Sequence, residues 1–168
     1  MEGLIGRVQL IDSTLDTKAL NWRPEDRPWS SGQILDHMNL AVAPYLDTLT
    51  PAITGARRCE ADPDVVHSWF GQLLIKASGP SGNAPAPKKL HPKSAVYDKS
   101  VAAKWIELHR HVIALAQRAR GLDLTAVTAK NPFIRIFRMN LADFFEVLTV
   151  HAERHVSQIE RLAEKAPK

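Results

Sequence analysis

The segment from Leu141 to Leu162 constrains the fold more than any other stretch, because its apolar residues recur three and four positions apart. This spacing predicts one amphipathic α-helix. Asn140 is a good N-cap, and Asp143 places a negative charge where the helix N-terminus favours it. The stripe consists of Leu141, Phe145, Leu148, Ala152, His155, Ile159 and Leu162. His155 lies in this stripe and His151 lies on or beside it, so both side chains are predicted to point into the protein.

His151 and His155 stand four residues apart, and residues at this spacing project to the same side of a helix, about one turn from each other. Two imidazoles on one face can bind a single divalent metal, but holding it needs at least one more donor. The alternative is a pair of core or boundary histidines with ordinary hydrogen bonds. The zinc-protease signature His-Glu-x-x-His does not apply, because Ala152 follows the first histidine and Glu153 lies about 200° around the helix from it.

A second amphipathic helix is predicted to begin after Ser30, which forms a capping box with Gln33. Pro44 removes a backbone donor and is expected to kink or end this helix near residues 40–43. The inward face of the helix carries Ile34, His37, Met38, Ala41 and Tyr45.

His37 is the candidate third metal donor. Taken alone, a histidine among apolar neighbours is more often a core residue with satisfied hydrogen bonds than a ligand. Together with His151 and His155, however, it supplies the donor that the pair lacks.

Two further helices are predicted from their apolar stripes. The first begins near the N-terminus and is expected to run to about Leu20. The other spans residues 99–120, and we expect His109 and His111, which flank its stripe, to lie at the surface or its boundary. The loop that follows contains a possible extended piece at residues 133–137.

Residues 50–99 form a long connection between helices. Pro51 and Gly55 are expected to break the second helix, and residues 65–77 are predicted to form a short helix whose aromatic cluster packs on the bundle as a lid. Residues 79–92 are rich in Pro, Gly and Ser and are expected to be irregular. A connection this long allows a crossover, so that the helices on either side of it run parallel.

The composition excludes several classes of protein. The 168 residues are 45% hydrophobic and 24% charged, which predicts a single domain over residues 1–168 with a real core. No secretion signal or membrane span is apparent, and the lone Cys59 excludes an intrachain disulfide framework, so a cytoplasmic protein is the default expectation. The net charge of +4 does not demand nucleic acid. We interpret the basic segment from Lys88 to Lys104 as a solvated loop.

Trp29-Ser30, then His37, then a distant helix with His151-x-x-x-His155 and Gln158-Ile159, is a pattern that resembles the DinB superfamily. This family includes the YfiT-like proteins and the bacillithiol transferases. The resemblance runs from about Val8 to Leu162. It implies an all-α fold, a four-helix bundle with a long crossover connection between the second and third helices. It also implies a divalent metal, zinc or nickel, held by His37, His151 and His155.

Three neutral imidazoles would leave a coordination position open, as in catalytic zinc sites. The first hypothesis is therefore a metal-dependent enzyme with a small-molecule substrate. It would be a transferase that uses a low-molecular-weight thiol, as the resemblance implies, or a hydrolase that activates water. The alternative is a non-enzymatic bundle, metal-binding or dimerising, with a stress-related or regulatory role and a homodimer as its assembly. Neither membrane nor nucleic acid is an expected partner. If the three histidines form the site, their nearest ring nitrogens should lie roughly 3–3.5 Å apart, and separations beyond about 6 Å would contradict it.

Overall fold

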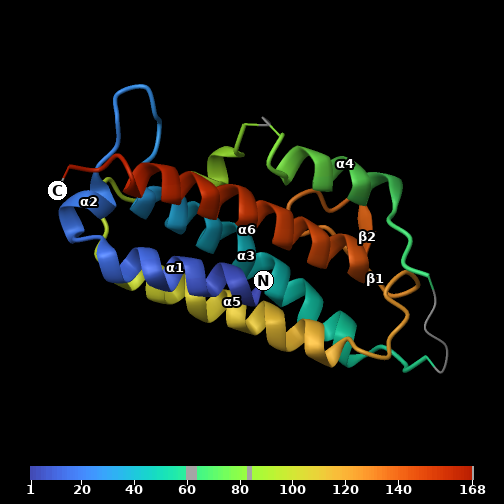
Figure 1. Cartoon of the computed structure of the whole chain (residues 1–168). Coiled ribbons are helices and arrows are strands. Elements are labelled where there is room, and N and C mark those ends of the chain that lie inside the picture. Colours follow the sequence, from blue (N-terminus) through green and yellow to red (C-terminus); the bar gives the residue numbers. More distant parts are fainter. Residues whose placement is uncertain (60–63, 83–84, 168) are drawn as a thin grey trace.

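Four long helices form the body of the molecule, and the prediction of an all-α four-helix bundle is confirmed (Figure 1). The computed structural model describes residues 1–59, 64–82 and 85–167. Its elements are α1 (Glu2–Thr14), α2 (Thr17–Asn21), α3 (Ser31–Thr54), α4 (Trp69–Ser78), the 3-10 helix η1 (Lys88–Leu90), α5 (Ser100–Arg118), β1 (Thr128–Lys130), β2 (Arg138–Asn140) and α6 (Leu141–Ala163). The helices α1 and α3 each pack against both α5 and α6.

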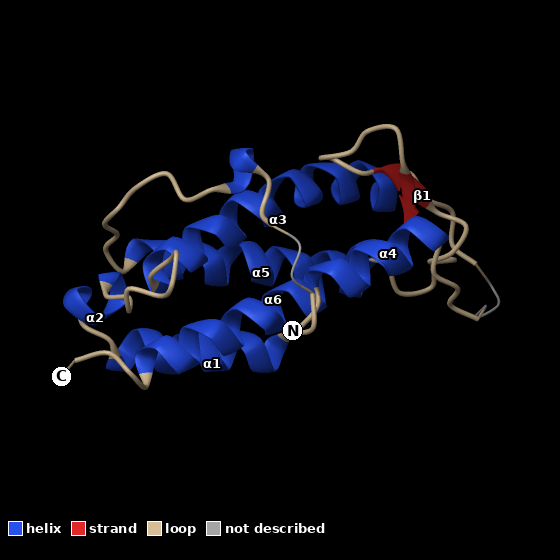
Figure 2. Cartoon of the chain, turned by 90° about the horizontal axis from the view of Figure 1, so that it is seen from above, coloured by secondary structure: helices blue, strands red, loops and turns tan. Residues whose placement is uncertain are grey.

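The chain direction follows from the colours in Figure 1: α3 and α5 run one way, and α1 and α6 run the other. The two parallel helices are joined by the long connection that carries α4 and η1, so the predicted crossover is confirmed. Both views place α4 outside the four long helices, alongside the first half of α6 (Figures 1 and 2). None of the helices in the described ranges combines the length and the apolar character that crossing a membrane requires.

The core extends through the bundle in two clusters of buried side chains. One cluster is centred on Trp105 of α5, whose indole N–H points to Met38 Sδ at 3.2 Å. The other contains Leu49 and Phe144, which are fully buried beneath α4 and the β1–β2 hairpin. Such a core is large enough to stabilise the bundle by apolar burial alone.

One buried carboxylate ties the start of α4 to the start of α6. Asp143 completes the capping box with Asn140, which confirms the predicted cap of α6. It also accepts hydrogen bonds from the Ser68 backbone N–H and hydroxyl, at 3.1 and 2.6 Å, and from His67 Nδ1 at 3.0 Å. A side chain in place of the hydrogen of Gly71 would collide with this carboxylate. The N-terminus of α4 is therefore fixed against α6.

Two of the predicted helix boundaries are wrong. The first helix does not continue to Leu20, because Asp16 interrupts it by capping α2 through the backbone N–H of Ala19 at 2.7 Å. Conversely, α3 does not end near residues 40–43 but continues through Pro44 and Pro51 to Thr54, and the predicted break at Gly55 is confirmed, because Gly55 is the C-cap. Each proline removes a single backbone donor and costs about 3 kcal/mol. Three buried side chains on this stretch of α3, Val42, Tyr45 and Leu49, pack in the core and hold the helix together. The predicted capping box of Ser30 and Gln33 is present.

The loops differ from the predictions in one respect. Residues 133–137 form a turn, and the extended pieces are β1 and β2 on either side of it, paired antiparallel. The buried side chain of Asn131 holds this turn, because its amide oxygen accepts from the backbone N–H groups of Phe133 and Ile134 at 2.9 and 2.8 Å. The predicted short helix is α4, and Phe70 packs into the bundle from it while Trp69 stays 66% exposed. Residues 79–92 are irregular apart from η1 and a turn, and 83–84 lie outside the described residues.

Candidate metal centre

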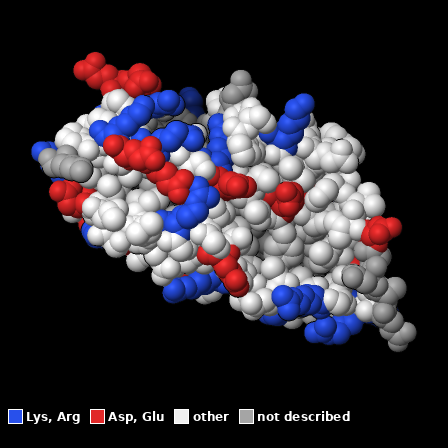
Figure 3. Space-filling model, in the orientation of Figure 1, with Lys and Arg blue, Asp and Glu red and all other residues white. Residues whose placement is uncertain are grey.

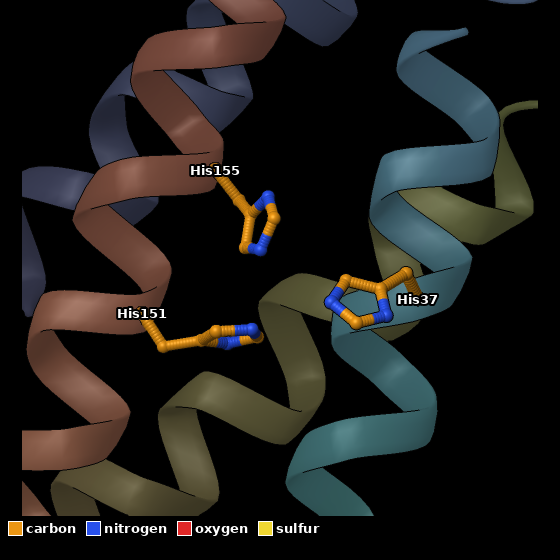
Figure 4. A group of neighbouring side chains, drawn as sticks. All are labelled: His37, His151 and His155. Carbon is orange, nitrogen blue, oxygen red and sulfur yellow. The ribbon is translucent and has the colours of Figure 1, made fainter. Parts of the chain in front are cut away.

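Three histidines from two helices converge inside the bundle. His37 projects from α3, and His151 and His155 project from α6 into the space between the two helices (Figure 4). Each ring offers one nitrogen, and these nitrogens all lie within 4.8 Å of one another. This limit exceeds the roughly 3–3.5 Å spacing of a tetrahedral zinc site and stays below the contradicting distance of about 6 Å. The predicted convergence is confirmed.

Two hydrogen bonds determine which nitrogens face the centre of the cluster. His37 Nδ1 lies 2.8 Å from the carbonyl oxygen of Leu90, and His155 Nδ1 lies 2.8 Å from Oε1 of Gln158. A carbonyl oxygen can only accept, so both Nδ1 atoms carry the proton. The unprotonated Nε2 of each ring keeps its lone pair for a ligand bond. This is the arrangement that metal-binding histidines commonly adopt.

Burial also keeps the cluster neutral. Burial, and after it the neighbouring His37, lowers the pKa of His155 from 6.5 to about 3. The pKa of His151 falls well below its ordinary value for the same reasons, burial first and then the other two histidines. Burial lowers the pKa of His37 as well, and its bond to Leu90 offsets part of this effect. Metal ligands must be unprotonated, so the environment prepares all three imidazoles for that role.

The cluster forms part of the wall of a pocket of about 960 Å³, a volume that suits a small molecule. Trp29 packs on His37 with ring centroids 4.9 Å apart, and Leu90 covers the same histidine from the crossover connection. Arg154 lines the pocket, and its positive charge lowers the pKa of each of the three histidines. Within residues 1–59, 64–82 and 85–167, no fourth His, Cys, Asp or Glu joins the three.

The prediction for His109 is wrong. Its side chain is 1% exposed and stacks on Trp105, with ring centroids 3.8 Å apart, while Nδ1 donates to the Trp105 carbonyl oxygen at 2.8 Å. Burial lowers its pKa to about 4. The spacing of four residues from Trp105, a core position, was a signal for this burial. His111 is exposed, as predicted.

Two partners of the cluster escaped the sequence interpretation. Gln158 follows His155 by three residues on the same side of α6, and this spacing could have identified it as a hydrogen-bond acceptor. Leu90 acts through its backbone carbonyl, and no side-chain pattern signals that role. Glu153 is exposed.

Fold and site together define a helical-bundle protein with a buried three-histidine cluster that is able to bind a metal. The sequence model of the DinB superfamily matches residues 8–159, and the chain belongs to this family. That span agrees with the predicted resemblance from Val8 to Leu162. Searches among curated proteins and among solved structures gave no match.

Proposed function

We propose that the protein binds a divalent metal ion through His37, His151 and His155 and catalyses a reaction of a small molecule at the open coordination position. Zinc is the first choice of metal and nickel the second, because imidazole nitrogens suit both ions. The observation that carries the proposal is the convergence of three ligand nitrogens on the wall of a large pocket. In the described part of the chain no carboxylate or thiolate adds to these ligands.

The chain's own residues prepare this site. Leu90 and Gln158 orient His37 and His155 with their Nε2 lone pairs free. Arg154 places a cation in the same pocket wall, where it favours an anionic nucleophile or a developing negative charge. A divalent metal held there would supply Lewis acidity that lowers the pKa of a bound water or thiol.

Thiol transfer is the proposed reaction, and hydrolysis is the alternative chemistry for the same site. A thiolate is the reactive form of a thiol nucleophile, and the site combines a place for a metal with a nearby arginine that favours the anion. The pocket of about 960 Å³ has room for both a thiol and a second reactant. We therefore expect the protein to join a low-molecular-weight thiol to a small electrophile.

A cobalt-substituted sample tests the open position directly. Co²⁺ takes zinc-like ligand sets and has visible absorption bands, and a thiolate ligand adds a charge-transfer band in the near ultraviolet. We expect 2-mercaptoethanol to produce this band with wild-type protein and not with His155→Ala. If the wild type binds cobalt but its absorption spectrum does not change with the thiol, the transferase proposal is contradicted. A structural metal without an open position is then favoured.

Turnover then separates the two reactions. Zinc-loaded protein is assayed for conjugation of 2-mercaptoethanol with 1-chloro-2,4-dinitrobenzene and for hydrolysis of p-nitrophenyl acetate. We expect zinc-dependent conjugation in the wild type and background rates in His155→Ala. Hydrolysis alone would replace the transferase by the hydrolase. If neither activity is found across a wider set of electrophiles and esters, the non-enzymatic alternative is supported.

A further inference from the structure

The pocket extends along α6 on both sides of the three histidines, and its two ends differ in chemistry. Its lining residues on α6, and just beyond the end of this helix, run from Val147 to Lys165. At a rise of 1.5 Å per residue, these 18 steps span roughly 27 Å. The helices α3 and α6 run antiparallel (Figure 1). Tyr45 therefore lies at the same end of the pocket as Val147, and Trp29, which precedes α3, lies at the end of the pocket that carries Lys165.

The end near Lys165 is basic. Arg154, Gln158, Arg161 and Lys165 follow one another at helical spacing along the pocket side of α6. Arg27, from the loop before α3, lines the same end, and Asp26 beside it is the sole acidic side chain among the described lining residues. Arg161 and Lys165 form no ion pair with any described residue. Four cations, Arg27, Arg154, Arg161 and Lys165, therefore line this end beside one carboxylate, Asp26, whose Oδ2 lies 3.8 Å from Nε of Arg27.

The opposite end is largely apolar, although the lining residue Lys89 places its Nζ 4.7 Å from the centroid of the Phe133 ring. Its lining comes from Tyr45, Leu74, Phe133, Val147 and Leu148. The aromatic ring of Phe133 packs edge-on against Tyr45, with ring centroids 5.4 Å apart, and forms a wall of this end. Figure 3 shows acidic and basic side chains mixed over the left half of the face it presents, where α6 ends, and fewer charged side chains in the right half.

We propose that the pocket takes a ligand with an anionic group, a carboxylate or a phosphate, joined to an apolar group. The anionic group lies among Arg27, Arg161 and Lys165. The apolar group lies against Tyr45 and Phe133. The reacting atoms between the two groups then lie beside the three histidines. The claim that this ligand is a substrate rests on the proposed function. The preference for an anionic ligand is a property of the pocket and can be tested separately. The proposal assigns Arg161 and Lys165, at the end of α6 and just beyond it, to the selection of an anionic ligand.

Two fluorescent probes that share an aromatic skeleton test the preference. 1-Anilinonaphthalene-8-sulfonate carries one negative charge, and N-phenyl-1-naphthylamine carries none. We expect the full-length wild type to bind the sulfonate about tenfold more tightly than the neutral probe, because several partly exposed cations each contribute modestly to its binding. The double variant Arg161→Gln/Lys165→Gln should lose most of this preference and bind the neutral probe as before.

Matched controls separate the pocket from general charge and from other apolar surface. Lys104→Gln/Arg110→Gln removes the same charge from exposed positions of α5 outside the pocket and should leave both affinities unchanged. Phe133→Ala should weaken both probes about fivefold or more. Ile136→Ala, at an 84% exposed position of the same loop that does not line the pocket, should weaken neither. Circular dichroism confirms the fold of each variant.

The proposal is overturned if the α5 double variant reduces sulfonate binding as much as the α6 double variant does, or if Phe133→Ala changes neither affinity. Titrations are run with matched samples, with and without one equivalent of zinc. A sulfonate preference that persists in zinc-free protein supports the ligand assignment even if zinc binding itself fails. Zinc binding through the histidines without any such preference leaves the proposed metal site intact and removes this inference.

Discussion

His109 and the three-histidine cluster are both buried in the bundle. They differ in whether the ring nitrogens of other histidines lie close by. The Nδ1 atoms of His109, His37 and His155 lie within hydrogen-bond distance of carbonyl-type oxygens, so burial and a satisfied proton are common to both regions. The cluster adds mutual approach, with ligand nitrogens within 4.8 Å. No such group forms around His109 in the described part of the chain.

This difference teaches that burial and a lowered pKa do not by themselves identify a functional histidine. The pKa of His109 is lowered to about 4 and that of His155 to about 3, and burial is the main cause in both. Only convergence separates them. His109 stacks on Trp105 and serves the core, whereas each of the other three imidazoles has one nitrogen within 4.8 Å of those of the other two.

The largest effect should come from removing one member of the cluster. We expect His155→Ala to abolish stoichiometric metal binding and to leave the bundle folded, with a loss of about 1–3 kcal/mol in the free energy of unfolding. Two imidazoles cannot hold the ion, while the apolar core does not depend on it. Metal content per chain and far-UV circular dichroism are measured together, and His37→Ala and His151→Ala should behave alike.

His109→Ala is the matched control, since it also truncates a buried imidazole. It should keep full metal content and lose about 1–3 kcal/mol of stability. The sequence alone predicted almost no loss for this change, because it placed His109 at the surface. Full metal occupancy in His155→Ala, or outright unfolding on metal loss, would remove the distinction between the two regions.

A smaller effect is expected for the hydrogen-bond partner of a ligand. Gln158→Leu removes the acceptor that holds the Nδ1 proton of His155. We expect zinc affinity to fall ten- to a hundredfold, because such partners fix the ring orientation and tautomer. Competition with a chelating dye measures the affinity. Gln117→Leu, at an exposed position of α5, should leave it unchanged; equal affinities for the two variants would show that Gln158 plays no part.

The pH dependence of stability sharpens the comparison further. His109 has a pKa of about 4 in the folded chain against 6.5 unfolded. The unfolded chain therefore binds more protons between these values, so this group lowers the free energy of unfolding as the pH falls below 6.5. At pH 5 the loss is about 2 kcal/mol. His109→Leu should remove that part of the acid sensitivity in zinc-free protein, measured by urea unfolding at pH 7.5 and 5. An unchanged difference between the two pH values would contradict it.

His111→Ala should have the smallest effect. Its side chain is exposed on α5, two residues beyond His109, and takes no part in the cluster. We expect metal content to stay the same and the free energy of unfolding to change by less than about 0.5 kcal/mol. A measurable loss of metal here would mean that histidines outside the cluster bind it.

The sequence predicted the fold through local signals that the structure retains. The capping box at Ser30, the N-cap at Asn140 and the apolar stripes located α3 and α6. The end of the first helix failed because Asp16 starts a new helix by a local cap, whereas the failed boundary at Pro44 depended on competition between local and tertiary energies. Pro44 is unfavourable within a helix, and the burial of its neighbours, which outweighs it, cannot be judged from one segment.

The candidate site was predictable to the extent that it consists of side chains on helices. His151 and His155 are related by helical spacing, and His37 faces inward on a well-signalled helix. Apart from Gln158, whose helical spacing from His155 could have identified it, the roles that were missed depend on distant parts of the chain. Asp143 was predicted only as a helix-start charge, and its bonds to His67 and Ser68 arise from the packing of α4 on α6.

The bond from His37 to the Leu90 carbonyl has an energetic consequence for the crossover loop. If the proposed metal site is correct, this hydrogen bond links the order of the loop to the metal affinity of the cluster. A molecule that held η1 in place would then strengthen metal binding by some factor, and by reciprocity the metal would strengthen the binding of that molecule by the same factor. Substitutions that loosen residues around Leu90 would weaken metal binding without changing an imidazole.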